Sequence, residues 1–276
     1  MKTLFLLVGA TLLGSCFYAS AQQLEKVWET DVELKTPESV LFDEDRNVMY
    51  VANINGDPTE KDGNGFISIL NSDGSAKNLH WVGNLNAPKG MALSAGKLYV
   101  SDIDQLVEID VNSGKVTQKY DAPDAVFLND VAATDDGDVF VTDTRTAKVH
   151  VLKNGKLTEW LSGKPLDSPN GLFAEKGKLF IGDLSIFEVD LKSKKITEYI
   201  SEAGGVDGLE KTGKGEFVFS NWPGKVYIHR KGKNVKLLDT TEQEINTADL
   251  DYSMKLDLIL VPTFFDNKVV AYRIIN

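Results

Sequence analysis

Residues 96–102 read GKLYVSD, a glycine followed by a short, mainly apolar run that ends in aspartate. A short apolar run between turn residues predicts a β-strand. The pattern occurs six times in the chain, and the other five copies are RNVMYVAN at 46–53, GDVFVTD at 137–143, GKLFIGD at 177–183, GEFVFSN at 215–221 and KLDLILVPT at 255–263. A strand repeated at intervals of about 40 residues indicates a repeat architecture.

A second repeated element lies just upstream of each strand and consists of a polar or small residue two positions before an apolar one. The first residues of these elements, hereafter the anchors, are Glu38, Lys89, Asn129, Asn170, Asp207 and Ala248. From each anchor to the end of the following strand the chain runs 13 to 15 residues. This narrow range predicts that the anchors occupy equivalent positions in the six repeats.

A third β run and, in most repeats, a fourth follow these strands, with turns such as Asn154-Gly155 that favour antiparallel hairpins. Four strands and about 40 residues per repeat are typical of a propeller blade. The sequence therefore predicts an all-β fold, a six-bladed β-propeller. The sixth repeat has no fourth run of its own, and residues 24–31 (LEKVWETD) are expected to supply that strand and close the ring.

The composition is that of a globular chain, with 42% hydrophobic and 26% charged residues among 276. Thirty basic and 41 acidic side chains give a formal charge of −11, so we expect no nucleic-acid partner. The single cysteine, Cys16, excludes an internal disulfide and any Cys-rich metal site.

Residues 1–21 have the pattern of an export signal, with Lys2, a short apolar run and small residues at Ala19 and Ala21. We expect residues 22–276 to form a single propeller domain that is exported, periplasmic or secreted, with no membrane span. The alternative is a lipoprotein anchored through Cys16, because residues 13–16 (LGSC) resemble a lipobox.

The first strand of each propeller blade lines the central channel, so the anchors are expected to form a ring at one mouth of it. Two carboxylates, Glu38 and Asp207, and two amides, Asn129 and Asn170, would meet there. Oxygen ligands without His or Cys suit a hard cation, with Ca²⁺ first and Mg²⁺, Mn²⁺ or Zn²⁺ as alternatives. The structural alternative is that crowded axial positions need small or hydrogen-bonding residues.

Four of these segments carry a family resemblance. They are PESV at 37–40, LNDV at 128–131 with Asp136-Gly137 downstream, PNGL at 169–172 and VDGL at 206–209. They resemble the metal-site motifs of the senescence-marker-protein (regucalcin), gluconolactonase and luciferin-regenerating enzyme family, which is related to the paraoxonase-type propellers. The resemblance implies one divalent cation held by Glu38, Asn170 and Asp207, with Asn129 close to the metal or its water, and hydrolysis of lactones.

Two anchors depart from that pattern: Ala248 offers no ligand, and Lys89 adds a positive charge to the ring. Lys89 is expected to bind the substrate or to protonate the leaving oxygen, or else to form a salt bridge with Glu38 or Asp207 that plugs the channel. The implied mechanism uses the cation as a Lewis acid and a water activated by the cation or by Asp207 as general base.

The loops between second and third strands should surround the same mouth. The longest, at 54–65, is interpreted as a lid. Trp222, Phe264 and Phe265 are candidates for an apolar substrate-binding wall, and Arg145 for contact with an anionic group.

We therefore expect a monomeric lactone or ester hydrolase with a small-molecule substrate, a sugar lactone being the first candidate. The alternatives are a non-catalytic propeller that binds a ligand or a protein partner, and a condensing enzyme similar to strictosidine synthase.

Overall fold

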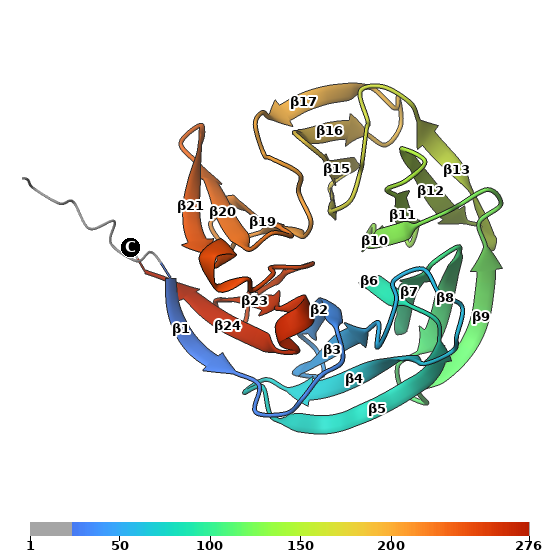
Figure 1. Ribbon diagram of the computed structural model, residues 1–276. Helices are drawn as coiled ribbons and strands as arrows, with labels where there is room; N and C mark the ends of the chain where they lie inside the picture. The colour runs from blue at the N-terminus through green and yellow to red at the C-terminus, as the bar shows by residue number, and fades with distance from the viewer. Residues whose placement is uncertain (1–23, 276) are drawn as a thin grey trace, which may run out of the picture.

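The computed structural model describes residues 24–275, which form six four-stranded sheets arranged in a ring (Figure 1). Every strand pairs antiparallel with its neighbours, and one edge strand of each sheet, the first in the chain in blades 1 to 5, lies nearest the centre. The six-bladed β-propeller expected from the sequence repeats is confirmed.

The sheets follow one another in chain order, and in blades 1 to 5 the innermost strand comes first in the sequence. Blades 1 to 3 are formed by β2 (Pro37–Asp43), β3 (Val48–Asn53), β4 (Gly65–Asn71) and β5 (Ala76–Leu85); β6 (Pro88–Ser94), β7 (Lys97–Asp102), β8 (Gln105–Asp110) and β9 (Lys115–Asp121); and β10 (Leu128–Ala133), β11 (Val139–Asp143), β12 (Lys148–Lys153) and β13 (Lys156–Ser162).

Blades 4 to 6 repeat this arrangement, with two short 3-10 helices in the loops of the described chain. They are formed by β14 (Leu172–Glu175), β15 (Lys178–Gly182), β16 (Ile186–Asp190) and β17 (Ile196–Ile200); β18 (Leu209–Lys211), β19 (Phe217–Asn221), β20 (Lys225–Arg230) and β21 (Lys233–Asp239), followed by η1 (Thr241–Gln243); and β22 (Asp251–Ser253), β23 (Leu258–Pro262), η2 (Phe264–Asp266), β24 (Val269–Ile274) and β1 (Leu24–Glu29).

The ring is closed by β1, which pairs antiparallel with β24 at the outer edge of blade 6. The pairing runs from Leu24 opposite Ile274 to Glu29 opposite Val270. Trp28 then packs against blade 1, where its ring lies against Gly74. The closing strand expected at 24–31 is therefore confirmed, and it joins the two ends of the described chain through backbone hydrogen bonds.

The core consists of apolar layers between neighbouring blades. One layer joins Tyr50 and Ile67 of blade 1 to Val100 and Val107 of blade 2, and all four side chains are buried. Equivalent layers lie between the other blades. Burial of these strand faces is the main stabilising contribution, since each fully buried aliphatic side chain contributes about 1.5–3 kcal/mol.

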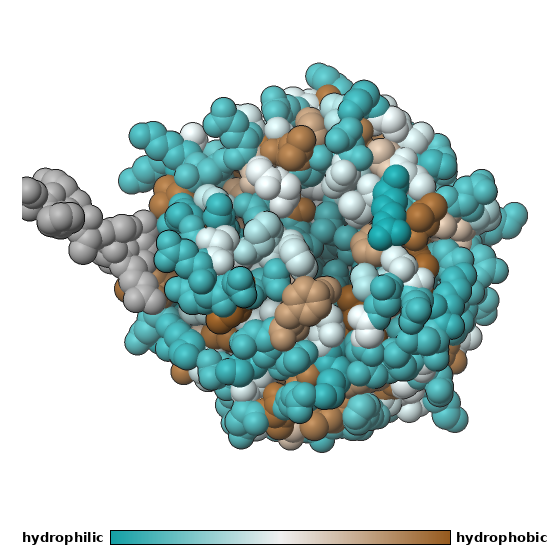
Figure 2. Space-filling view, viewed as in Figure 1, coloured by the Kyte–Doolittle hydropathy of each residue, from teal (hydrophilic) through white to brown (hydrophobic). Residues whose placement is uncertain are grey.

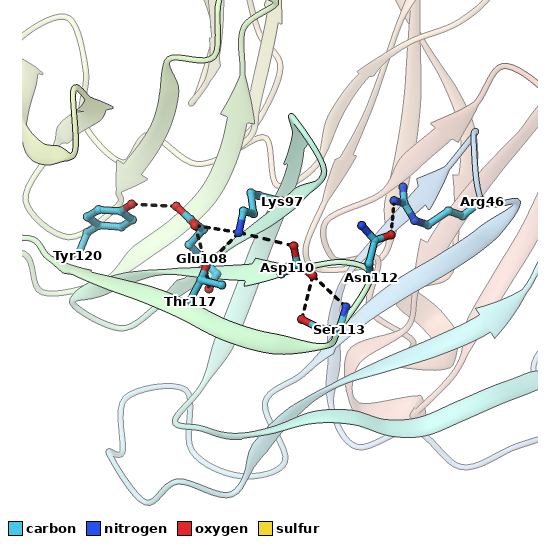
Figure 3. Close-up of polar contacts among 8 residues, drawn as sticks. All are labelled: Arg46, Lys97, Glu108, Asp110, Asn112, Ser113, Thr117 and Tyr120. Carbon is cyan, nitrogen blue, oxygen red and sulfur yellow. Dashed lines mark hydrogen bonds and ion pairs between the residues drawn. The ribbon is translucent and has the colours of Figure 1, made fainter.

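Polar networks lie toward the outside of the blades and in the turns between strands. In blade 2, the Lys97 ammonium lies 3.5 Å from a Glu108 oxygen and 3.7 Å from an Asp110 oxygen (Figure 3). Arg46 of blade 1 donates a 3.0 Å hydrogen bond to the side chain of Asn112 in blade 2. Contacts of this kind at a solvated surface contribute about 0–1 kcal/mol each, so they order the rim more than they hold the ring together.

The expected export signal and Cys16 lie outside the described residues. Within residues 24–275, no helix has the length and apolar character needed to cross a membrane.

Near the axis the inner strands approach so closely that some positions have no room for a side chain. A Cβ on Gly208 would lie 2.2 Å from the backbone nitrogen of Leu250 in blade 6. Gly90 and Gly171 have the same environment, with backbone atoms of the next blade at 2.4 and 2.5 Å. These glycines follow the anchors Lys89, Asn170 and Asp207 directly, so the polar-Gly-apolar motif is a packing requirement of the axis.

Substitution of Gly208 by alanine should therefore displace the backbone between blades 5 and 6. We expect Gly208→Ala to lower the free energy of unfolding by about 1–3 kcal/mol, measured by urea denaturation. Gly83→Ala is the matched control, because a Cβ there meets no atom within 4 Å, and its effect should stay within about 0.5 kcal/mol. Equal effects of the two substitutions would contradict this account of the axis.

Candidate functional site at the mouth of the central channel

A cavity of about 340 Å³ lies at the mouth of the channel. Its lining contains five of the six anchors and all three expected aromatic residues, together with four further residues, and the full set is Glu38, Ile54, Gly56, Pro58, Lys89, Phe127, Asn129, Asn170, Asp207, Trp222, Phe264 and Phe265. Figure 2 shows a hollow near the centre of the face that carries η1 and η2, with apolar side chains beside it. The ring expected from the repeat register is therefore present.

Local irregularities of the inner strands place the anchors at the mouth. The pairing of β2 with β3 shifts register around Glu38, that of β6 with β7 around Lys89, and that of β10 with β11 around Asn129. Bulges of this kind bend a strand and redirect a side chain. In blades 4 and 5 the anchors Asn170 and Asp207 lie just before the inner strand begins.

Two oxygen atoms of this ring are buried without a hydrogen-bond partner. They are Oε2 of Glu38 and Oδ1 of Asn170. The amide nitrogen of Asn170 donates a 2.6 Å hydrogen bond to Oδ1 of Asp207, so the two residues are already aligned. Nearly all buried polar atoms in proteins are paired. Two unpaired oxygens at one cavity therefore indicate a binding site for a cation or for a ligand that donates hydrogen bonds to them.

Burial changes the protonation of both carboxylates. Desolvation raises the pKa of Glu38 well above its usual range, and the charges of Asp207 and Asp249 raise it further, against the opposing effect of Lys89. Desolvation also raises the pKa of Asp207 to about 7, although the hydrogen bond from Asn170 opposes this. At neutral pH desolvation therefore favours a protonated Glu38 and leaves Asp207 near the middle of its titration, unless a cation compensates their charge.

Lys89 is fully buried, and its ammonium is held by backbone oxygens. It donates hydrogen bonds to the carbonyls of Pro58 at 3.0 Å and Ala87 at 2.8 Å. It also lies 4.6 Å from the centre of the Phe127 ring. Desolvation lowers the pKa of Lys89 to about 8, although the charge of Glu38 opposes this. Within the described chain we find no ion pair of Lys89 with Glu38 or Asp207 at 4.0 Å or less, so the salt-bridge alternative lacks support.

Trp222, Phe264 and Phe265 form one aromatic cluster at the mouth. Their rings meet edge to face, with centres 4.8 to 6.1 Å apart. Phe264 has a φ of 50°, a left-handed conformation that is rare for a bulky residue and costs about 1–3 kcal/mol. Below it lie Ile54, Ala87 and Ala248 in a buried apolar cluster. Ala248, the anchor without a ligand atom, thus supports the aromatic wall.

Arg145 does not line the cavity. It is exposed, and the carbon of its guanidinium lies 4.6 Å from the centre of the Phe127 ring. Phe127 itself was not among the predicted residues. Its signal in the sequence is weak: it lies two residues before the anchor Asn129, where the other repeats have Thr, Ala, Ser, Gly or Asn. Pro58 and Gly56 belong to the loop 54–65, which does lie at this mouth.

A set of buried carboxylates, not predicted from the sequence, lies below the ring. Asp130 accepts a 2.5 Å hydrogen bond from the backbone nitrogen of Leu172 in the next blade, and Asp251 accepts one of 2.6 Å from that of Phe42. These bonds connect blade 3 to blade 4 and blade 6 to blade 1. Desolvation raises the pKa of Asp130 well above its usual range, and that of Asp251 to about 6.

Comparisons with known proteins support the fold. No protein-family profile matches the chain, and no curated protein matches it in sequence. Among solved structures, the WD40 β-propeller domain of Doa1 is similar to it with a TM-score of 0.64 and 15% identity, over 85% of this chain and 77% of that chain. At this identity the likeness shows the fold alone: the chain is a β-propeller.

The raised pKa of Asp251 makes stability depend on pH. Between about pH 4 and 6 the folded state holds a proton on Asp251 that the unfolded state has lost, so unfolding becomes easier as pH rises through this window. Asp251→Asn cannot lose that proton and keeps an acceptor for Phe42. The thermal midpoint of Asp251→Asn minus that of the unsubstituted protein should therefore increase between pH 4 and pH 7. Asp136→Asn, in an exposed turn, should show no such change with pH. If the difference in midpoint for Asp251→Asn were the same at pH 4 and pH 7, the protonation of Asp251 would not be the cause.

Proposed function

We propose that this propeller is an exported, divalent-metal-dependent hydrolase of lactones, as its resemblance to the regucalcin and gluconolactonase family implies. The observation that carries the proposal is the meeting of Glu38, Asn129, Asn170 and Asp207 from four blades at one cavity. A purely structural ring has no need for two carboxylates whose burial opposes their ionisation.

The donor set fits a hard cation. Its oxygens come from two carboxylates and two amides, which suit Ca²⁺ first and Mg²⁺ or Mn²⁺ next, with Zn²⁺ least favoured because no nitrogen or sulfur donor takes part. Among residues 24–275, no group of three or more His, Cys, Asp or Glu side chains is arranged to hold a metal. The ligand set proposed here therefore depends on the amides, and on the unpaired oxygens of Glu38 and Asn170 in particular.

When bound, such a cation supplies Lewis-acid stabilisation of the charge that develops on the lactone carbonyl oxygen. The residues of the chain supply the rest. Asp207 accepts a proton from the attacking water, and Lys89 donates a proton to the ring oxygen as the acyl–oxygen bond breaks. Water and lactone then give one hydroxy acid. The lowered pKa of Lys89 makes this proton easier to transfer near neutral pH.

A non-catalytic ligand-binding propeller is the second candidate. The observation that favours it is the position of Lys89, whose two hydrogen bonds to the carbonyls of Pro58 and Ala87 also serve to fix the blade 1 loop. In that case the pocket would bind a small molecule without changing it.

Addition of Ca²⁺ should raise the thermal midpoint of the protein, because a ligand that binds only the folded state stabilises it by about 2.7 kcal/mol at 100 times its Kd. Glu38→Gln should abolish most of that gain, since it removes a ligand charge. Glu60→Gln makes the same chemical change on an exposed side chain of the blade 1 loop and should behave like the unsubstituted protein. No stabilisation by Ca²⁺, Mg²⁺, Mn²⁺ or Zn²⁺ would eliminate the metal site.

The proposed role of Lys89 predicts a pH profile. A proton donor acts in its charged form, so lactone turnover should fall as pH rises through about 8. Lys89→Met should lower kcat by about 10²–10⁴-fold and lose this descending limb. Lys89→Arg keeps the charge but does not titrate in this range, so its residual activity should stay level above pH 8. If Lys89→Met retained the parent kcat and pH profile, the lysine would have no part in proton transfer.

A further inference from the structure

The body of the cavity is apolar on one side because of the aromatic cluster. All three rings line the cavity, and Phe264 is buried there, whereas Trp222 and Phe265 still expose 42% and 65% of their surface. Large aromatic side chains left open to water at a cavity mouth are typical of a surface that a ligand covers. They offer flat apolar area to whatever part of a ligand extends out of the channel.

The remaining walls are also largely apolar. Ile54 and Pro58 come from the blade 1 loop, and Phe127 from the segment before β10. The ammonium of Lys89 and the guanidinium of Arg145 both lie 4.6 Å from the centre of the Phe127 ring, so this ring shields cationic groups while facing the cavity. Apolar side chains from four blades, namely 1, 3, 5 and 6, thus line the cavity.

Part of the hydrogen-bonding capacity of the polar donors in the cavity is already used within the protein. The Asn129 amide donates to the Thr144 hydroxyl at 3.2 Å, and the Asn170 amide to Asp207 at 2.6 Å. Lys89 donates to two backbone carbonyls. Glu38 and Asp207 are assigned to the cation, and the third N–H of Lys89 to the lactone ring oxygen. The second N–H groups of Asn129 and Asn170 are then the side-chain donors left to replace the water that the hydroxyl groups of a polyhydroxylated ligand would lose on entry. Each unpaired hydroxyl would then reduce affinity.

We infer that the substrate is a lactone whose non-reacting part is an alkyl or aryl group and not a polyhydroxylated sugar chain. This inference rests on the proposed function, because it concerns the same cavity. It departs from the sugar lactone that the family resemblance made the first candidate. The ester group would lie at the acidic floor, and the apolar substituent would extend along Phe127 toward Trp222 and Phe265.

The test compares three δ-lactones on the whole protein in the presence of Ca²⁺: δ-undecalactone, unsubstituted δ-valerolactone and glucono-δ-lactone. Turnover is measured as hydroxy-acid formation above the spontaneous rate, and binding is measured independently by calorimetry. We expect kcat/KM and affinity for δ-undecalactone to exceed those for glucono-δ-lactone by at least about 100-fold.

Substitutions at the aromatic cluster test which side chains cause the preference for δ-undecalactone. Phe265→Ala and Trp222→Ala should each reduce kcat/KM and affinity for δ-undecalactone by about 10-fold and leave δ-valerolactone within about twofold. Leu184→Ala is the matched control, because Leu184 is 63% exposed in a loop of the same type in blade 4 but does not line the cavity. It should leave all three lactones unchanged.

The two proposals fail in different ways. If glucono-δ-lactone is bound or hydrolysed as well as δ-undecalactone, or if both aromatic variants keep the parent preference, the apolar substrate class is wrong while lactone hydrolysis stands. If δ-undecalactone binds with the expected preference but is not hydrolysed with Ca²⁺, Mg²⁺, Mn²⁺ or Zn²⁺, the ligand class stands and the hydrolase is wrong. If none of the three lactones binds or reacts, both are wrong.

Discussion

The backbones of the inner strands approach one another so closely along the propeller axis that a Cβ atom does not fit at every position. Gly90, Gly171 and Gly208 each bring a backbone atom of the next blade within 2.2 to 2.5 Å of the place a Cβ would take. The residue just before each of these glycines is then directed to the channel mouth, and in the described chain these residues are Lys89, Asn170 and Asp207. Close packing at the axis therefore allows no side chain at these glycine positions and places the preceding, larger polar residue at the channel mouth.

The same crowding controls the electrostatics of the channel. Side chains near the axis lose their water, and desolvation is the largest cause of the raised pKa of Glu38, Asp207, Asp130 and Asp251. The two lower carboxylates are compensated by backbone N–H groups of the next blade. Glu38 has no such compensation for Oε2. Asp130 and Asp251 thus connect blades, whereas Glu38 keeps an oxygen without a partner, and this difference supports a ligand site at the mouth that carries Glu38.

Most of the fold and the ring could be predicted from the sequence because both depend on local spacing. A strand such as 96–102 and its anchor Lys89 belong to one repeat, so counting residues is enough to align six blades and to assign the closing strand. Phe127, Pro58 and the acids below the ring could not be found in this way. Their roles come from contacts between blades, for example Asp130 with Leu172 of the next blade, and a repeat pattern carries no information about which neighbour a side chain meets.

Lys89 shows why residue type alone was insufficient at the ring. From the sequence, a lysine among carboxylates has two alternatives, a role toward the substrate or a salt bridge with Glu38 or Asp207, since buried charges are seldom left uncompensated. In the structure its ammonium is instead satisfied by the carbonyls of Pro58 and Ala87 and by the face of Phe127. The charge is therefore stabilised without occupying the oxygens of Glu38 or Asp207. Because Pro58 belongs to the loop that lines the cavity, the protonated lysine also holds that loop in place. The charge of the ring and the shape of the cavity wall therefore depend on the same side chain.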